Sequence, residues 1–207
     1  MIYRDYQQKM HDEFRDAWAG GAKAVLGQLP TAGGKSALVA GNVSAFDGPT
    51  CSIAHRQELV GQLSMALCRY GVEHRIVAAE ATVREIVRQQ LDEFGRSFYR
   101  PGSIHGVASV DTLILLPEND RWLPKVGLAI FDEAHHTTRE GATKGSVGKW
   151  MRALNRMPLA LLLGLTATPS RADGKGLGRH ADGVFDVMVE GPPMRELINR
   201  GYLSEYQ

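Results

Sequence analysis

The stretch Val126-Gly127-Leu128-Ala129-Ile130-Phe131-Asp132-Glu133-Ala134-His135 decides the fold of this 207-residue chain. Residues 126–131 form a short apolar run, which predicts a strand buried on both faces. Asp132 and Glu133 follow this strand directly. Open parallel sheets bind ligands beyond the carboxyl ends of their strands, so the two acids stand where a ligand is expected. One carboxylate can hold Mg²⁺ through water while the other orients a water for attack on a phosphate.

Upstream, the stretch Leu29-Pro30-Thr31-Ala32-Gly33-Gly34-Lys35-Ser36 has the chemistry of a phosphate-binding loop. Gly33 and Gly34 allow backbone N–H groups to close on phosphate oxygens, and the helix that follows directs its positive end at the same anion. Lys35 can reach the β and γ phosphates, and the Ser36 hydroxyl can ligate Mg²⁺. The stretch is one glycine short of the pattern G-x-x-x-x-G-K-[ST], because its first position is leucine.

A third motif, Thr166-Ala167-Thr168-Pro169, ends an apolar run at residues 161–165. Its two hydroxyls can hydrogen-bond the acidic motif and sense phosphate occupancy. Taken singly, each motif has a plainer interpretation: a glycine turn beside a lysine, a helix cap with a solvated acid, and a polar strand exit ended by proline. The three motifs in this order favour a site for a nucleoside triphosphate.

Helical and strand periodicities alternate along the chain. The patterns predict strands at residues 24–29, 50–54, 75–78, 104–110, 126–131 and 159–166. They predict helices at residues 5–18, 35–45, 57–70, 82–98, 111–116, 149–156 and 194–200. Strands that alternate with helices form a parallel sheet with helices on both faces, so we expect an α/β fold.

The composition gives the chain no global electrostatic preference. Its 24 basic and 23 acidic side chains leave a formal net charge of +1, so any contact with nucleic acid must be local. Cys51 and Cys68 match no disulfide or metal pattern, which predicts a reducing, cytoplasmic setting. The apolar run at residues 159–165 is far shorter than the roughly 20 residues of a membrane helix, so no membrane association is expected. His135 and His136 lack the HExxH spacing of a zinc site.

As an ordered set, the three motifs resemble motifs I, II and III of superfamily 2 helicases and translocases. Tyr3-Arg4-Asp5-Tyr6-Gln7 resembles the Q motif, and Ala54-His55-Arg56-Gln57-Glu58-Leu59 resembles motif Ia. Ala108-Ser109-Val110-Asp111-Thr112-Leu113 resembles a later strand-contacting motif. The Asp-Glu-Ala-His-His sequence is similar to a DEAH-type branch that includes restriction-enzyme motor subunits of type III and phage helicases, as are the later residues Arg171, Asp173, Gly174, Lys175 and Gly176. The resemblance spans residues 3–202.

The resemblance implies an ATPase that uses Mg²⁺, with a role for each matching residue. The catalytic residues would be Lys35, Asp132 and Glu133, with Ser36 and Asp132 holding the metal. Gln7 would read the adenine edge, although Gln8 stands next to it. The other nucleotide contacts would come from Arg4, Thr31, Ala32, Gly33, Gly34, Lys35 and Ser36. The coupling residues would be His135, Thr166 and Thr168. The contacts to the nucleic-acid backbone would come from Arg56, Ser109 and Thr112, and the resemblance favours DNA as that partner.

The family builds its motor from two RecA-like domains. The resemblance assigns residues 1–190 to the first of them, a RecA-like three-layer sandwich, and residues 191–207 to the connection toward a second domain. That domain, or a partner chain, would supply an arginine finger, so the chain alone is expected to bind ATP weakly and hydrolyse it hardly at all. One alternative is a nucleotide-responsive nucleic-acid-binding or adaptor module that does not hydrolyse ATP. A second is the motor segment of a restriction endonuclease.

Overall fold

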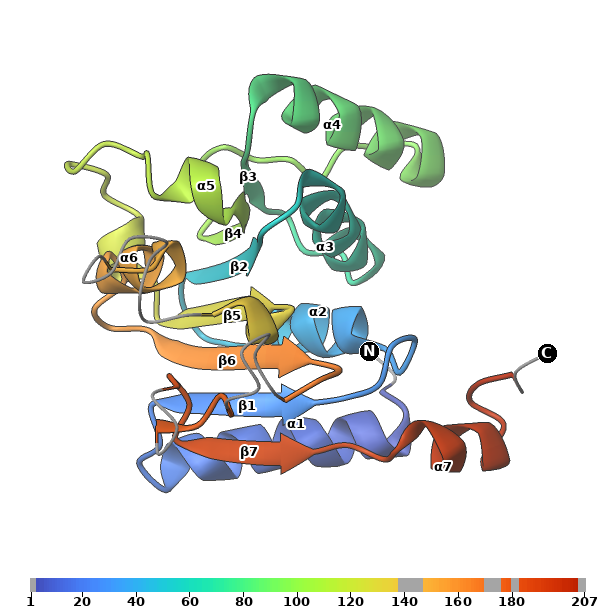
Figure 1. Ribbon diagram of the computed structural model, residues 1–207. Coiled ribbons are helices and arrows are strands. Elements are labelled where there is room, and N and C mark those ends of the chain that lie inside the picture. Colours follow the sequence, from blue (N-terminus) through green and yellow to red (C-terminus); the bar gives the residue numbers. More distant parts are fainter. Residues whose placement is uncertain (1–2, 138–146, 170–175, 180–182, 205–207) are drawn as a thin grey trace.

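Seven strands form a single sheet in the computed structural model, which describes residues 3–137, 147–169, 176–179 and 183–204 (Figure 1). The strands are β1 (Ala24–Gln28), β2 (Thr50–Ala54), β3 (Arg75–Val77), β4 (His105–Ser109), β5 (Leu128–Asp132), β6 (Leu161–Thr166) and β7 (Val187–Glu190). Their order across the sheet is β3-β4-β2-β5-β6-β1-β7, and every neighbouring pair runs parallel. The predicted α/β fold with a parallel sheet is confirmed.

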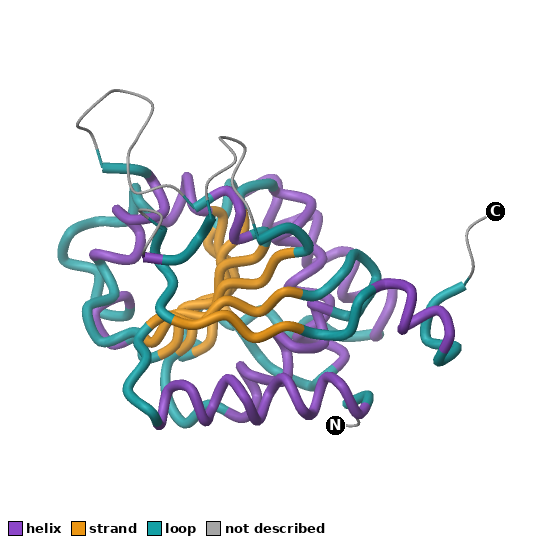
Figure 2. Tube along the Cα trace, turned by 60° about the horizontal axis from the view of Figure 1, so that its bottom comes forward, coloured by secondary structure: helices purple, strands orange, loops and turns teal. Residues whose placement is uncertain are grey.

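Helices cover both faces of this sheet (Figure 2). One apolar core receives side chains from α1 (Asp5–Ala19), α2 (Lys35–Ala45), α3 (Gln57–Arg69), α4 (Glu80–Phe94) and α7 (Met194–Asn199). A second core receives them from α5 (Val110–Leu113), α6 (Lys149–Asn155) and the 3-10 turns η1 (Leu123–Lys125) and η2 (Ala134–His136). The sheet therefore separates two cores, as the predicted three-layer sandwich requires. In the described part of the chain, no helix is both long and apolar enough to cross a membrane.

The uninterrupted apolar sequence of strand β5 follows from its burial on both faces of the sheet. Leu128 and Ile130 belong to the core on the α1–α4 face, while Ala129 and Phe131 belong to the core on the opposite face. All four side chains are fully buried. Successive side chains of a strand point to opposite faces, so a strand covered on both sides cannot alternate with polar residues.

The three motifs follow strands that are neighbours in the sheet. Strand β6 lies between β5 and β1, and its register pairs Leu165 with Asp132 and Thr166 with Gln28. Because parallel strands end at the same edge of a sheet, the loop after β1, the acids after β5 and the end of β6 meet there (Figure 1).

Most predicted bounds agree with the structure to within two residues, although α5 ends at Leu113 and not at the predicted residue 116. Two further differences have a clear physical reason. The helix predicted at residues 82–98 is α4, which ends at Phe94 because Gly95 takes a left-handed φ of +68° and its N–H bonds the Leu91 carbonyl. Strand β7 was not predicted. Only Val189 of its four residues is buried, so this edge strand shows neither an apolar run nor a full alternation.

The last described residues return to the beginning of α1. Leu197 of α7 is fully buried in the α1–α4 core. Arg200 forms an ion pair with Asp5, and the Tyr202 hydroxyl donates a hydrogen bond of 3.0 Å to the same carboxylate. The segment that follows β7 therefore packs on the element that carries the Q-motif-like residues.

Candidate functional site

Gly34 forms the turn between the glycine loop and α2. Its φ of +89° is left-handed, a conformation that glycine adopts without strain. A Cβ atom at this position would lie 2.3 Å from Gln7 Nε2, so a larger residue would have to displace the Gln7 side chain. Leu29, which replaces the first glycine of the phosphate-loop pattern, is fully buried, and its N–H donates to the Thr166 carbonyl at 2.9 Å. The leucine therefore anchors the loop to β6.

The beginning of α2 offers unpaired backbone donors. Among the described residues, the N–H groups of Gly34, Lys35 and Ser36 have no hydrogen-bond partner. The Gly33 N–H is used within the loop, where it donates to the Pro30 carbonyl at 3.0 Å. Unpaired N–H groups and the positive end of a helix dipole together form an anion site. The loop and α2 can hold phosphate in this way.

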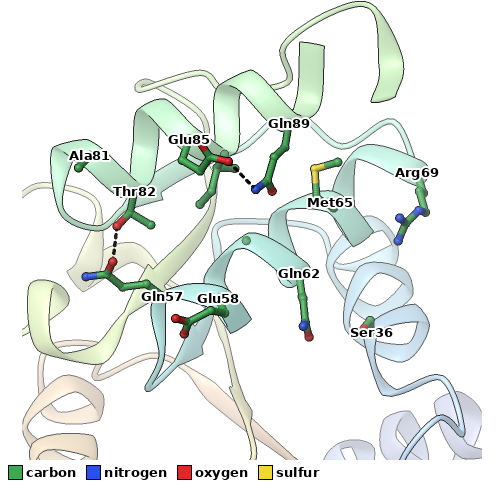
Figure 3. Close-up of a pocket in the computed structure, with 12 residues that line it drawn as sticks. Ser36, Gln57, Glu58, Gln62, Met65, Arg69, Ala81, Thr82, Glu85 and Gln89 are labelled. Carbon is green, nitrogen blue, oxygen red and sulfur yellow. Dashed lines mark hydrogen bonds between the residues drawn. The ribbon is translucent and has the colours of Figure 1, made fainter. Parts of the chain in front are cut away.

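The remaining loop side chains face outward. Thr31, Ala32 and Ser36 are exposed, and Ala32 has a positive φ of 62°. Ser36 also borders a groove of 790 Å³ between α3 and α4 (Figure 3). Neither Lys35 nor Glu133 lines this groove. The candidate phosphate site thus lies open at the edge of the sheet. The groove is a separate feature that begins beside this site.

Lys35 and Glu133 meet across the end of β6. Glu133 has a left-handed φ of +52°, and the Lys35 Nζ atom lies 3.7 Å from its Oε1 atom. The side chains are 12% and 26% exposed, so solvent screens this ion pair only in part. The predicted catalytic lysine and the predicted water-positioning acid are therefore brought together. No direct contact joins Ser36 to Asp132 among the described residues.

Asp132 lies at the end of β5 beside this pair. Burial and the neighbouring charge of Glu133 raise the pKa of the Asp132 carboxyl, while the positive charge of Lys35 opposes the rise. One Asp132 oxygen accepts the Glu133 N–H at 3.1 Å. Two adjacent carboxylates that face a single lysine leave negative charge uncompensated. The donor set of two carboxylate groups and the Ser36 hydroxyl fits a hard divalent cation such as Mg²⁺.

His135 links the acidic motif to the third motif. Its Nδ1 atom lies 3.0 Å from Thr166 Oγ1 and 3.3 Å from Glu133 Oε2. Thr166 is fully buried, and its hydroxyl oxygen lies 2.8 Å from the Thr168 carbonyl oxygen and 3.1 Å from the Thr168 nitrogen. The three predicted coupling residues are thus joined by hydrogen bonds from His135 to Thr166 and within the Thr166–Thr168 turn, and Glu133 lies beside His135.

The N-terminal residues of α1 hold the glycine loop. The buried Tyr6 hydroxyl donates to the Gly33 carbonyl at 2.8 Å, and Gln7 Nε2 lies 3.4 Å from the same oxygen. Arg4 donates to the Tyr6 hydroxyl at 3.1 Å, and its N–H donates to Gln7 Oε1 at 3.0 Å. Gln8, in contrast, is exposed and bonds Asp12. The structure therefore places Gln7, and not Gln8, beside the loop.

The candidate nucleic-acid residues follow two neighbouring strands. Arg56 is exposed at the N-cap of α3, just beyond β2, while Ser109 ends β4 and is buried. The sheet register pairs Ala54 with Ser109, so the two strand ends lie side by side. Thr112 lies half-buried in α5. These three residues share the sheet edge that carries the acidic motif.

Sequence reasoning missed two features of this edge. Tyr6 was given no role at the loop, yet its hydroxyl donates a hydrogen bond to the Gly33 carbonyl; the position of this tyrosine next to Gln7 was the available signal. His136 contacts the rings of both His55 and His135, a contact that no spacing rule predicts. The branch residues Arg171, Asp173, Gly174 and Lys175 lie outside the described residues.

Comparison with solved structures shows the same fold in several larger proteins. The Hef helicase domain of Pyrococcus furiosus matches 99% of this chain with a TM-score of 0.62 and 18% identity. The UvsW helicase of bacteriophage T4 matches 92% with a TM-score of 0.58 and 18% identity. The Type ISP restriction-modification enzyme LlaGI, solved with a DNA substrate mimic, matches 97% with a TM-score of 0.60 and 12% identity. The chain covers 41%, 60% and 21% of these proteins, respectively.

A search of curated proteins found no match. A family model, in contrast, matches residues 1–171, a range that contains the glycine loop, the acidic motif and the third motif. That range is most of the chain, and its motifs lie together at one edge of a RecA-like sheet. The chain therefore belongs to the ResIII family, the res subunit of type III restriction enzymes.

Proposed function

We propose that this chain is the ATP-binding domain of a superfamily 2 DNA motor, which couples the binding and hydrolysis of Mg²⁺-ATP to movement along nucleic acid. The contact between Lys35 and Glu133 carries the proposal, because it joins the loop after β1 to the acid pair after β5 at one sheet edge. Membership of the ResIII family supports it. The motor would be of the DEAH type, and this domain would be its first.

The residues at this edge of the sheet would have separate roles in phosphate cleavage. The unpaired N–H groups at the beginning of α2 and the Lys35 ammonium would hold the triphosphate, and Ser36 and Asp132 would hold the metal. Mg²⁺, when bound, neutralises phosphate charge. Glu133 accepts a proton from the attacking water and orients it. Gln7 and Arg4, which are held by hydrogen bonds at the beginning of α1, would recognise the base.

Changes at the phosphates would reach the nucleic acid through the edge of the sheet. His135 and Thr166 would respond to Glu133, because His135 lies 3.3 Å from Glu133 Oε2 and is hydrogen-bonded to Thr166. Arg56, Ser109 and Thr112 would contact the strand backbone, which makes binding independent of sequence and sensitive to salt. We expect the chain to act in the cytoplasm, where the buried Cys51 and Cys68 stay free thiols.

A second RecA-like domain or a partner chain would complete the site with an arginine finger. Such a group accelerates phosphoryl transfer by roughly 10³–10⁵ where it has been assessed. We therefore expect the isolated chain to bind ATP and to turn it over very slowly. The family match makes the motor segment of a restriction endonuclease the second candidate function.

Turnover of ATP tests the proposal. Phosphate release by the chain is measured with and without single-stranded DNA, beside Glu133→Gln. Binding of ATP with slow turnover supports a motor domain that awaits its second half. Fast DNA-stimulated turnover that is lost in Glu133→Gln would show a self-sufficient ATPase and contradict the arginine-finger argument. Absence of nucleotide binding would overturn the proposal.

A further inference from the structure

Three histidine rings form a continuous contact at the sheet edge. The His55 and His136 ring centroids lie 4.1 Å apart, and those of His136 and His135 lie 4.2 Å apart. His55 follows β2, whereas His135 and His136 belong to η2, which follows β5. Strands β2 and β5 are paired in the sheet, so their ends are held at a fixed separation. The rings bridge the two loops that follow these strands.

One end of the ring stack lies at the candidate hydrolysis site. His135 Nδ1 lies within hydrogen-bond reach of both Thr166 Oγ1 and Glu133 Oε2. Glu133 is in turn the ion-pair partner of Lys35. A change in the partners of Glu133 therefore changes the balance of contacts on the His135 ring.

The other end lies at the candidate nucleic-acid contact. His55 directly precedes Arg56, the exposed N-cap residue of α3. The buried Nδ1 atom of His55 has no hydrogen-bond partner among the described residues. The His55 ring packs against His136, and its Nδ1 atom adds no hydrogen bond to that contact. Movement of His136 can thus reach the backbone that carries Arg56.

The charges around the stack are compatible with ring contact. Partial desolvation lowers the pKa of His55 and of His136. Neighbouring positive charges, among them Arg56, lower both further, whereas the charge of Glu133 opposes the change. Both rings are therefore mainly neutral at pH 7, and no charge repulsion opposes their contact. Lys149 also acts on His55, although its ammonium is paired with Asp111 at 3.0 Å.

We propose that His136 is a positioning residue that transmits the state of Glu133 to Arg56 through ring contacts with His135 and His55. The inference rests on the proposed function and extends it, because it names the route between the nucleotide site and the strand contact. His136 is exposed, so its replacement is not expected to unfold the domain. It touches neither the phosphates nor the strand in this scheme.

Histidine side-chain NMR tests this route without requiring turnover. The Cε1–Hε1 signals of the chain are recorded before and after addition of Mg²⁺ and a non-hydrolysable ATP analogue. In the unchanged protein, we expect the signals of His135 and His55 both to shift. In His136→Ala, the His135 signal should still shift while that of His55 should not. His136→Phe, which keeps an aromatic ring, should restore the His55 shift. His105, which lies on β4 and bonds Thr50, serves as the control that stays unchanged.

The outcomes separate this inference from the proposed function. An equal His55 shift in His136→Ala and in the unchanged protein would overturn the transmitting role, and so would an unmoved His55 signal in the unchanged protein. If calorimetry detects no binding of the analogue, the proposed function fails and the route fails with it. The opposite direction gives a second readout: a short single strand of DNA should shift the His135 signal in the unchanged protein and not in His136→Ala.

Discussion

The Lys35 Nζ atom lies 3.7 Å from the Glu133 Oε1 atom, although the two residues follow strands that are separated by β6. The pair is only partly exposed. Under the proposed function, Glu133 would compete with a bound phosphate for the Lys35 ammonium. An acid that activates water and also restrains the phosphate-binding lysine has opposite effects on binding and on hydrolysis.

Glu133→Gln should separate these two effects. The substitution removes the negative charge that holds Lys35, so Mg²⁺-ATP should bind as tightly as before or more tightly. Any turnover, measured in the complete motor, should fall by roughly 10²–10⁴ because the proton acceptor is lost. Calorimetry and phosphate release give the two values. Glu118→Gln, which removes an exposed acid elsewhere, should change neither. Weaker binding in Glu133→Gln would show that the acid helps to hold the nucleotide.

Gly34→Ala should damage the loop more than an ordinary loss of glycine does. The alanine Cβ would meet Gln7 Nε2 at 2.3 Å and would also occupy a φ of +89°. Gly21→Ala is the matched control, because Gly21 has a φ of +97° and nothing within 4 Å of its added Cβ. The positive φ alone should lower the free energy of unfolding of either alanine variant by about 1 kcal/mol. Chemical denaturation should show that Gly34→Ala lowers the free energy of unfolding more than Gly21→Ala does. Only Gly34→Ala should bind ATP less tightly. Equal losses would mean that Gln7 moves aside freely.

Gln7→Ala should weaken ATP binding, and Gln8→Ala should not. Gln7 is buried against the glycine loop, while Gln8 bonds only the exposed Asp12. Loss of the hydrogen bonds of Gln7 should also lower stability by about 1 kcal/mol. Fluorescence titration with ATP and GTP analogues measures the effect, and the preference for ATP should shrink in Gln7→Ala alone. A reduced preference for ATP in Gln8→Ala would show that Gln8, and not Gln7, recognises the base.

His74 should make the domain sensitive to acid. This fully buried ring bonds Ser64 at 2.8 Å and the Val72 carbonyl at 2.9 Å. Burial lowers the pKa of His74 from 6.5 to about 4, so the unfolded chain binds a proton more readily than the folded one between these values. The neutral ring therefore stabilises the fold above pH 6.5, and up to about 3 kcal/mol is lost as the pH falls toward 4.

Urea denaturation at several pH values between 7 and 4.5 measures this loss. His74→Asn retains an amide donor for the Val72 carbonyl and has no titrating ring. Its free energy of unfolding should fall less steeply with acid than that of the unchanged protein. Parallel curves for the two proteins would place the acid sensitivity in other groups.

The sequence predicts the central part of the fold well. Helix α2 and strand β2 have the predicted bounds 35–45 and 50–54. Buried central strands such as β5 must be apolar on both faces, and this requirement leaves a strong local signal. The edge strand β7 leaves no such signal, because three of its four residues are exposed. Its place depends on pairing with β1, which is a long-range contact.

The motifs of the candidate site were predictable from the sequence, but the contacts between them were not. The glycine loop and the acid pair are recognisable from local chemistry. Their contact through Lys35 and Glu133 depends on β6 lying between β1 and β5, and chain order does not give the order of strands in a sheet. The ring contact between His136 and His55 likewise depends on the short 3-10 turn η2 and on the pairing of β2 with β5.

Calorimetric titration of the chain with ATP, in the presence and absence of Mg²⁺, tests most directly whether this sheet edge is a nucleotide site. We predict one site that depends on Mg²⁺ and is weakened at least about tenfold in Lys35→Ala, a loss of about 1.4 kcal/mol. Lys9→Ala removes a well-exposed lysine of α1 and should bind as the unchanged protein does. Equal affinity in Lys35→Ala and the unchanged protein, or binding without any need for Mg²⁺, would contradict the assignment of the site.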